Sequence, residues 1–105
     1  MIKTEAAKVA SAGTTIVCKN APNASMFIDN HIDEIFCGPG MLQLLRENEK
    51  ELDAFVLGCT CDVNIDIMRE VTEEPVVGIG ESSMLVAMIL AISKVSVKRL
   101  IFFAP

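Results

Sequence analysis

The sequence contains four cysteines, and Cys59 is the one whose surroundings suggest chemistry. It ends the apolar run 53–59, which predicts a strand covered on both faces, and it precedes a helix predicted to begin near Asp62. A helix N-terminus favours thiolate over thiol, and a thiolate can abstract a weakly acidic proton from carbon when a second acid stands on the opposite face. The alternative is that Cys59 is only a small apolar residue of the core.

Two further groups of residues have the right types for chemistry. The spacing Cys59-Thr60-Cys61 raises a metal pair as an alternative, but the chain has one histidine and no Cys-x-x-Cys pair. A metal site is therefore not expected, and Cys61 is given no role. His31, beside Asp33 and Glu34, is a candidate general acid or substrate contact in a loop. A solvated loop histidine is the alternative.

The elements that must position these residues alternate between helix and strand. Predicted helices carry apolar residues at helical spacing, whereas predicted strands are β-branched or continuously apolar. This alternation implies parallel strands joined by helices, so we expect the α/β class, with a flavodoxin-like parallel sheet and flanking helices. The expected order is helix 4–10, strand 14–18, a loop with one or two helical turns in 25–37, helix 41–52, strand 53–59, helix 62–71, strand 75–80, helix 81–93 and strand 95–103.

Sheets of this kind bind ligands beyond the carboxyl ends of their strands, where backbone N–H groups of the following loops point outward. Cys59 and Thr60 follow one predicted strand, and Gly80, Glu81 and Ser82 follow the next. The sequence Gly78-Ile79-Gly80 lacks the third glycine and the context of a dinucleotide-binding fingerprint. We therefore expect a small-molecule site at this edge, without a nucleotide cofactor.

Length and composition indicate one globular domain spanning residues 1–105. The chain is 51% hydrophobic and 22% charged, with a net charge of -5 and a mean hydropathy of +0.46. Its few Lys and Arg residues are scattered, so neither nucleic acid nor an anionic membrane is an expected partner. The cysteines lie in apolar or strand-like surroundings, which favours a reduced, cytoplasmic protein. The longest apolar run, 84–92, is about half the ~20 residues of a membrane span.

An ordered series of motifs resembles a known family. Gly58-Cys59-Thr60-Cys61-Asp62, then Asp66 and the segments 69–72 and 75–81, resemble the hydantoin and allantoin racemase branch of the aspartate/glutamate racemase superfamily. Upstream, the segments 14–17, 31–34 and 39–40 also fit, so the similarity extends to about Ala91. The resemblance implies a pseudo-symmetric, cofactor-independent enzyme of two α/β domains. Such an enzyme racemises amino acids or hydantoins with one cysteine from each domain, placed across the substrate's α-carbon.

The resemblance also assigns roles to individual residues. Cys59 matches the first catalytic cysteine. Thr60 would offer its hydroxyl and amide to a substrate carboxylate or ring carbonyl, with a helix cap as the alternative. Asp62 and Glu81 match acidic positions, although Asp62 can also cap its helix. Ser82 is a candidate because it opens the next predicted helix.

Two departures from the family pattern affect the expected activity. The chain begins after the family's first strand and ends where a second domain would begin, so the second cysteine is missing. We therefore expect an incomplete member, in which 95–105 is either the start of a second domain or a pairing strand. The strand 95–103 is apolar and needs a partner, which suggests a homodimer in which two copies of Cys59 face each other.

Two other classes of function compete with the racemase. One is a non-catalytic domain that keeps the fold and binds a small anion or a protein. The other is a thiol-dependent hydrolase or redox protein, which needs a base near Cys59. His31 is the only histidine available for that role.

Overall fold

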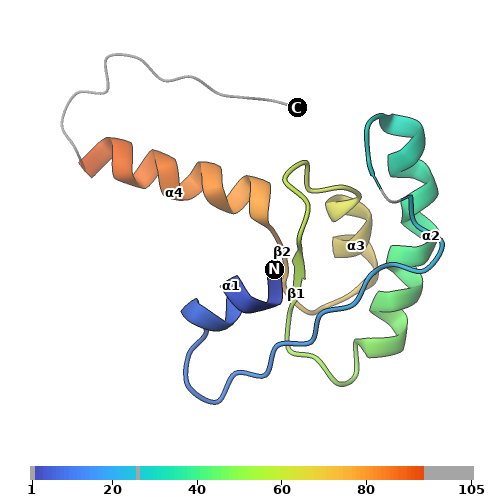
Figure 1. Cartoon of the computed structure of the whole chain (residues 1–105), viewed down its shortest axis with the longest axis horizontal. Helices are drawn as coiled ribbons and strands as arrows, with labels where there is room; N and C mark the ends of the chain where they lie inside the picture. Colours follow the sequence, from blue (N-terminus) through green and yellow to red (C-terminus); the bar gives the residue numbers. More distant parts are fainter. Residues whose placement is uncertain (1, 26, 94–105) are drawn as a thin grey trace. The chain divides into compact units, whose positions relative to one another are not determined.

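The structure is a computed structural model that describes residues 2–25 and 27–93. Contacts divide the chain into two compact units, Met1–Glu47 and Asn48–Pro105, and each is described by itself. The single domain expected from the length stays a prediction, and the strand expected at 95–103 lies outside the described residues. The elements, in chain order, are α1 (Ile2–Val9), α2 (His31–Asn48), β1 (Phe55–Leu57), α3 (Ile65–Val71), β2 (Val76–Gly78) and α4 (Ile79–Ser93) (Figure 1).

The first unit is helical, and the strand predicted at 14–18 does not form in it. The sheet of the described residues contains β1 and β2 alone, and Val17 is 48% exposed. The strand propensity of β-branched residues reflects packing against neighbouring strands rather than a backbone preference. Without a neighbouring strand to pair with, residues 14–18 form neither a helix nor a strand.

Helix α2 begins ten residues before the helix predicted at 41–52. Asn30 caps it, because its Oδ1 accepts hydrogen bonds from the N–H groups of Ile32 (2.9 Å) and Asp33 (3.1 Å). Asp33 returns the bond by accepting from the N–H of Asp29 at 3.1 Å. The expected separation between the helical turns in 25–37 and the helix 41–52 is wrong, since α2 continues through Pro39. Proline already has a helical φ, so the helix can continue through Pro39, although this residue has no N–H to donate to the preceding turn.

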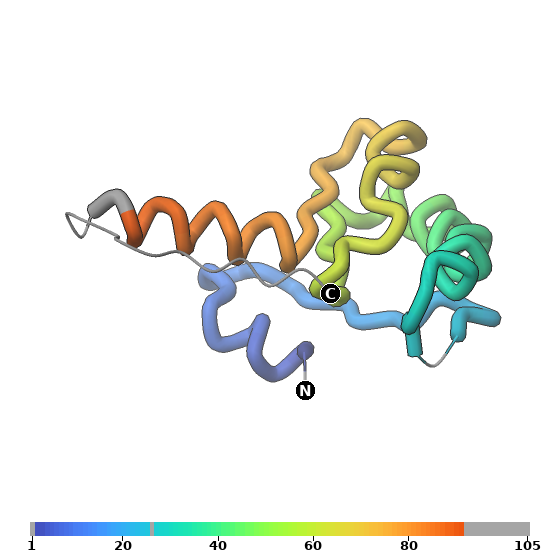
Figure 2. Tube along the Cα trace, turned by 90° about the horizontal axis from the view of Figure 1, so that it is seen from above, coloured from blue at the N-terminus to red at the C-terminus, as the bar shows by residue number. Residues whose placement is uncertain are grey.

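The second unit contains a β-α-β arrangement. β1 and β2 are parallel, with Phe55 opposite Val76, Val56 opposite Val77 and Leu57 opposite Gly78. α3 connects them and contacts β2. The predicted α/β class, with a parallel sheet and flanking helices, is confirmed. Figure 2 shows α4 leaving the carboxyl end of β2 without an intervening loop.

Only one face of this sheet is covered. Val76 of β2 and Met68 of α3 are buried, whereas Val56 and Val77 share the opposite face and are 68% and 38% exposed. The prediction of a β1 strand covered on both faces is therefore wrong for the described residues. α4 is apolar around its circumference yet similarly open, with Met84, Leu85, Val86, Met88, Ile89 and Leu90 between 47% and 65% exposed. None of the helices in the described ranges is long and apolar enough to cross a bilayer.

The cap of α2 gives a test of the first unit. Replacing Asn30 with alanine removes the acceptor of two backbone N–H groups, so we expect a loss of about 1 kcal/mol in the free energy of unfolding. Urea titration followed by circular dichroism measures the loss. Asn30→Asp keeps an acceptor oxygen and should retain nearly all the stability. An equal loss in both variants would contradict the capping role.

Candidate functional site

Cys59 lies in a tight turn at the carboxyl end of β1. β1 ends at Leu57, and the N–H of Asp62 donates to the carbonyl of Cys59 at 3.0 Å, which closes the turn. Cys59 is half-buried, whereas Cys61 is exposed, and their Sγ atoms are 3.0 Å apart. The position of Cys59 just after a parallel strand is as predicted. Cys59 is therefore not enclosed in the core and remains partly accessible to solvent.

The helix after this turn begins later than predicted. α3 starts at Ile65 rather than near Asp62, because Asp62 and Asn64 have φ values of 49° and 57°. These left-handed conformations are incompatible with a right-handed helix. α3 therefore does not begin beside Cys59. The argument that its N-terminus favours a Cys59 thiolate loses its structural basis.

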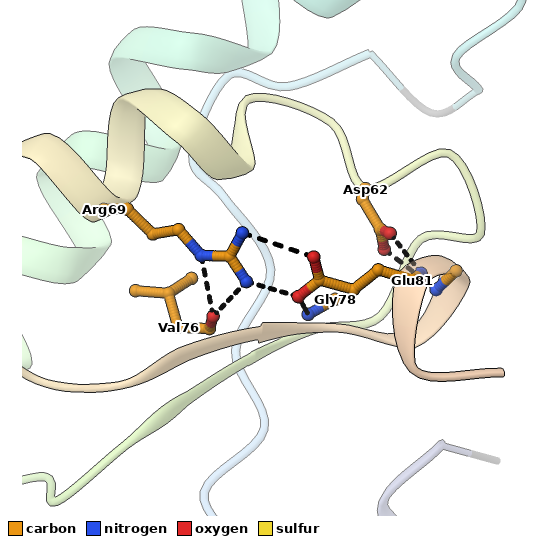
Figure 3. A network of polar contacts seen from close by, with 6 residues as sticks. Asp62, Arg69, Val76, Gly78 and Glu81 are labelled. Atoms are coloured by element: carbon orange, nitrogen blue, oxygen red, sulfur yellow. Dashed lines mark hydrogen bonds and ion pairs between the residues drawn. The ribbon is translucent and has the colours of Figure 1, made fainter. Parts of the chain in front are cut away.

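Asp62 instead caps α4, which follows the second strand (Figure 3). Its Oδ1 accepts from the N–H of Gly80 at 2.9 Å, and its Oδ2 accepts from the N–H of Glu81 at 2.6 Å. These N–H groups belong to the first turn of α4, where the helix has no carbonyl partners for them and a negative charge is favoured. The carboxylate thus ties the Cys59 turn to the junction between β2 and α4. The sequence offered Asp62 as a cap of the helix that follows it, α3, whereas in the structure it caps α4.

Two glycines make room for this carboxylate. A Cβ on Gly78 would lie 2.3 Å from Cγ and Oδ1 of Asp62. On Gly80 it would lie 2.2 Å from the carbonyl oxygen of Thr60 and 2.7 Å from Oδ2 of Asp62. All four distances are shorter than any van der Waals contact. The Gly-x-Gly sequence serves close backbone packing, a role that was not assigned from the sequence although a glycine pair at a strand-helix junction signals it.

Arg69 and Glu81 form a second tie at the same junction (Figure 3). Nε and Nη2 of Arg69 donate to the carbonyl of Val76 at 3.1 and 2.9 Å, and Nη1 donates to Oε2 of Glu81 at 3.2 Å. Nη2 also pairs with Oε1 of Glu81, which accepts the N–H of Gly78 at 3.2 Å. α3, β2 and α4 are thereby joined through one guanidinium group. Sequence reasoning did not assign Arg69 a role.

These contacts explain the protonation behaviour of the pair. The hydrogen bond from Arg69, followed by the one from the N–H of Gly78, lowers the pKa of the Glu81 carboxyl below its ordinary value. The hydrogen bond to Glu81 correspondingly raises the pKa of Arg69. Both side chains are partly exposed, so solvent screens the pair. Glu81 is therefore a charged anchor rather than a proton donor.

The remaining predicted site residues divide between the two units. Thr60 is exposed in the Cys59 turn, and Ser82 is half-buried as the fourth residue of α4, which it was expected to open. His31 belongs to the first unit, where its side chain is 98% exposed and its Nδ1 lies 3.1 Å from Oε2 of Glu34. The second unit thus brings Cys59, Thr60, Asp62 and Glu81 to one strand-helix junction. In residues 2–25 and 27–93, no cluster of three or more potential metal ligands occurs.

The second unit is therefore an α/β domain in which a cysteine-bearing turn is held at the carboxyl edge of a parallel sheet, where domains of this class bind their ligands. The sequence profile of the Asp/Glu/Hydantoin racemase family matches residues 1–97, and the chain belongs to this family. It is 37% identical over 91 residues to a hydantoin racemase of Pseudomonas sp. (strain NS671), covering 86% of this chain and 36% of that protein.

Two further relatives carry the same name. The chain is 33% identical over 84 residues to the hydantoin racemase of Rhizobium meliloti, covering 79% of this chain and 35% of the relative. It is 30% identical over 81 residues to that of Paenarthrobacter aurescens, covering 75% and 34%. The chain thus spans about a third of the length of the curated relatives it matches. No solved structure matches the chain significantly.

The two hydrogen bonds that Asp62 accepts from α4 predict that this side chain stabilises the second unit. Asp62→Ala leaves two N–H groups of α4 without their charged acceptor, and we expect a loss of about 2 kcal/mol in the free energy of unfolding. Asp62→Asn keeps one acceptor oxygen and should fall between. Glu73→Ala, at an exposed position after α3, is the control and should change stability little. Urea unfolding compares the three variants, and equal losses for Asp62→Ala and Glu73→Ala would contradict the capping role of Asp62.

The Arg69–Glu81 pair predicts a pH dependence. Because folding lowers the pKa of Glu81, its contribution to stability is complete above the ordinary value of 4.5 and disappears as the pH falls through the lowered pKa. Wild type should therefore be more stable than Glu81→Gln at pH 7, and the difference should shrink in acid. Urea midpoints of both proteins between pH 7 and the acid limit provide the measurement. A difference that stays constant with pH would show that charge is not involved.

Proposed function

We propose that this chain forms one wall of a cofactor-independent racemase site that exchanges the α-proton of a hydantoin-like substrate at Cys59. The single observation that carries the proposal is the position of Cys59 in the turn after β1, beside the junction from which α4 begins. Parallel sheets bind ligands at this edge. Family membership and relatives named hydantoin racemase support the choice of reaction.

The chemistry asks little of the protein beyond a positioned base and acid. The Cys59 thiolate removes the proton from the substrate's α-carbon, and the electron pair moves into the adjoining carbonyl to give an enolate. Inversion then requires a second acid that returns a proton to the opposite face. Cys61 does not suit that role, because its sulfur lies 3.0 Å from that of Cys59 and would stand on the same side of the substrate.

A second copy of the chain is the proposed source of this acid. Two protomers that face each other would place one Cys59 thiol on each side of a substrate, which reproduces a two-domain cleft. The open sheet face with Val56 and Val77 and the exposed apolar side chains of α4 supply surface that such an association would bury. A further domain carrying its own acid would serve equally well.

The hydrogen bonds of Asp62 favour a neutral ring over a free carboxylate as the substrate group next to Cys59. Asp62 already occupies the N–H groups of Gly80 and Glu81, which would otherwise attract an anionic substrate at the start of α4. We assign Asp62 and Glu81 to positioning of the turn. Thr60, exposed beside Cys59, is the proposed hydrogen-bonding partner of a ring carbonyl, and Ser82 and His31 are secondary candidates.

Deuterium exchange tests the reaction directly. The full chain is incubated with a 5-substituted hydantoin in deuterated buffer, and loss of the α-proton signal is followed by NMR against a protein-free sample. We expect Cys59→Ser to lower the protein-dependent rate by about 100-fold or more, because a serine hydroxyl does not ionise near neutral pH and is a far weaker base than a thiolate. Cys18→Ser, which alters an exposed cysteine of the first unit, should leave the rate unchanged.

The same assay distinguishes the alternatives. An exchange rate that increases more than in proportion to the protein concentration would support assembly of the site from two copies. An amino acid that exchanges faster than the hydantoin would overturn the choice of a neutral ring. Absence of exchange in wild type and Cys59→Ser alike would favour a non-catalytic domain that keeps the racemase fold to bind a small anion or a protein.

A further inference from the structure

The turn that carries Cys59 holds a second sulfur within reach of the first. The Sγ atoms of Cys59 and Cys61 are 3.0 Å apart, although Thr60 separates the two residues in the chain. The proposed proton transfer uses Cys59 and leaves Cys61 without a part. Cys61 is also the more exposed of the two residues.

The local geometry requires little movement for the two sulfurs to bond. A disulfide has an S–S distance of about 2.05 Å, so the gap closes by about 1 Å. The hydrogen bond from the N–H of Asp62 to the carbonyl of Cys59 folds the backbone into a turn that contains both cysteines. β1 ends at Leu57 and α3 begins at Ile65, so a small adjustment of the turn does not interrupt either element.

We propose that Cys59 and Cys61 form a reversible disulfide that switches the site off, an inference that rests on the proposed function of Cys59. The oxidant is a low-molecular-weight disulfide such as glutathione disulfide. The Cys61 thiolate attacks one of its sulfurs, which forms a mixed disulfide and releases one glutathione thiolate. The Cys59 thiolate then attacks the Cys61 sulfur and releases the second.

The exchange conserves protons and electrons. Two protein thiols lose two protons and two electrons, and glutathione disulfide becomes two molecules of glutathione. In the product the Cys59 sulfur carries no charge and no proton, so it cannot accept a proton from carbon. A disulfide that is exposed and closes so short a loop is readily reduced, as a labile rather than a structural disulfide is. A thiol reductant therefore restores the dithiol.

Peptide mapping detects the modification without reference to activity. Trypsin cuts after Lys50 and Arg69, so the peptide 51–69 contains Cys59 and Cys61 alone, while Cys18 and Cys37 fall in two other peptides. After treatment of the full chain with glutathione disulfide and then iodoacetamide, we expect the peptide 51–69 to be unalkylated. It should weigh about 2 Da less than its dithiol form, and dithiothreitol should reverse the change.

A matched variant tests the role of Cys61. Cys61→Ser cannot close the ring, so Cys59 should instead retain a glutathione adduct of about 305 Da. In wild type, stable glutathione adducts on the peptide 51–69, or disulfides that join it to the peptides of Cys18 or Cys37, would overturn the proposal. Alkylation of both sulfurs at full yield after prolonged oxidation would do the same.

The deuterium-exchange assay then connects the disulfide with the site. Oxidised wild type should lose its exchange activity about tenfold or more and regain it with dithiothreitol, whereas reduced Cys61→Ser should exchange at the wild-type rate. A disulfide found by mass in a chain that never exchanges protons would refute the function of Cys59 but not the pairing. Exchange that persists in the fully oxidised chain would refute the switch.

Discussion

The carboxylate of Asp62 lies between two parts of the chain that are nearly twenty residues apart, and the geometry of the second unit follows from its two hydrogen bonds. It accepts from Gly80 and Glu81 and so fixes the turn after β1 against the start of α4. A charged acceptor on the first turn of a helix both satisfies otherwise unpaired N–H groups and opposes the helix dipole. Gly78 and Gly80 are required because their missing side chains leave the space that this carboxylate fills. Cys59 is held at the sheet edge as a consequence.

Sequence patterns predicted the elements of this unit better than their limits. The apolar runs around Phe55 and Val76 identified both strands and their parallel pairing, because continuous apolar segments alternating with helices are typical of that arrangement. The start of α3 was misplaced because Asp62 and Asn64 adopt left-handed conformations that no periodicity signals. The contacts of Asp62 and Arg69 depend on residues distant in the chain, so local patterns placed Asp62 near the site without revealing its partners and gave Arg69 no role.

The sheet and α4 leave apolar surface that is unusual for a self-contained domain. Val56 and Val77 form an open face, and α4 carries exposed apolar side chains around its circumference. Burial of one such side chain contributes about 1.5–3 kcal/mol, and a helix that is apolar all round is normally enclosed. The relatives that share the family are about three times as long as the matched region. Covering these surfaces by additional protein would therefore stabilise the unit.

The two sulfurs and the anchors place competing demands on the turn. The proposed proton transfer would need Cys59 to be reduced and fixed in position, and the hydrogen bonds of Asp62 hold the turn one residue after Cys61. Ring closure needs the two Sγ atoms to approach by about 1 Å, within a turn whose ends are held by β1 and by that same carboxylate. A turn held more loosely would let the sulfurs pair more readily but would place Cys59 less accurately. The rigidity that Asp62 confers would therefore set both how accurately the proposed base is placed and how readily the two thiols oxidise.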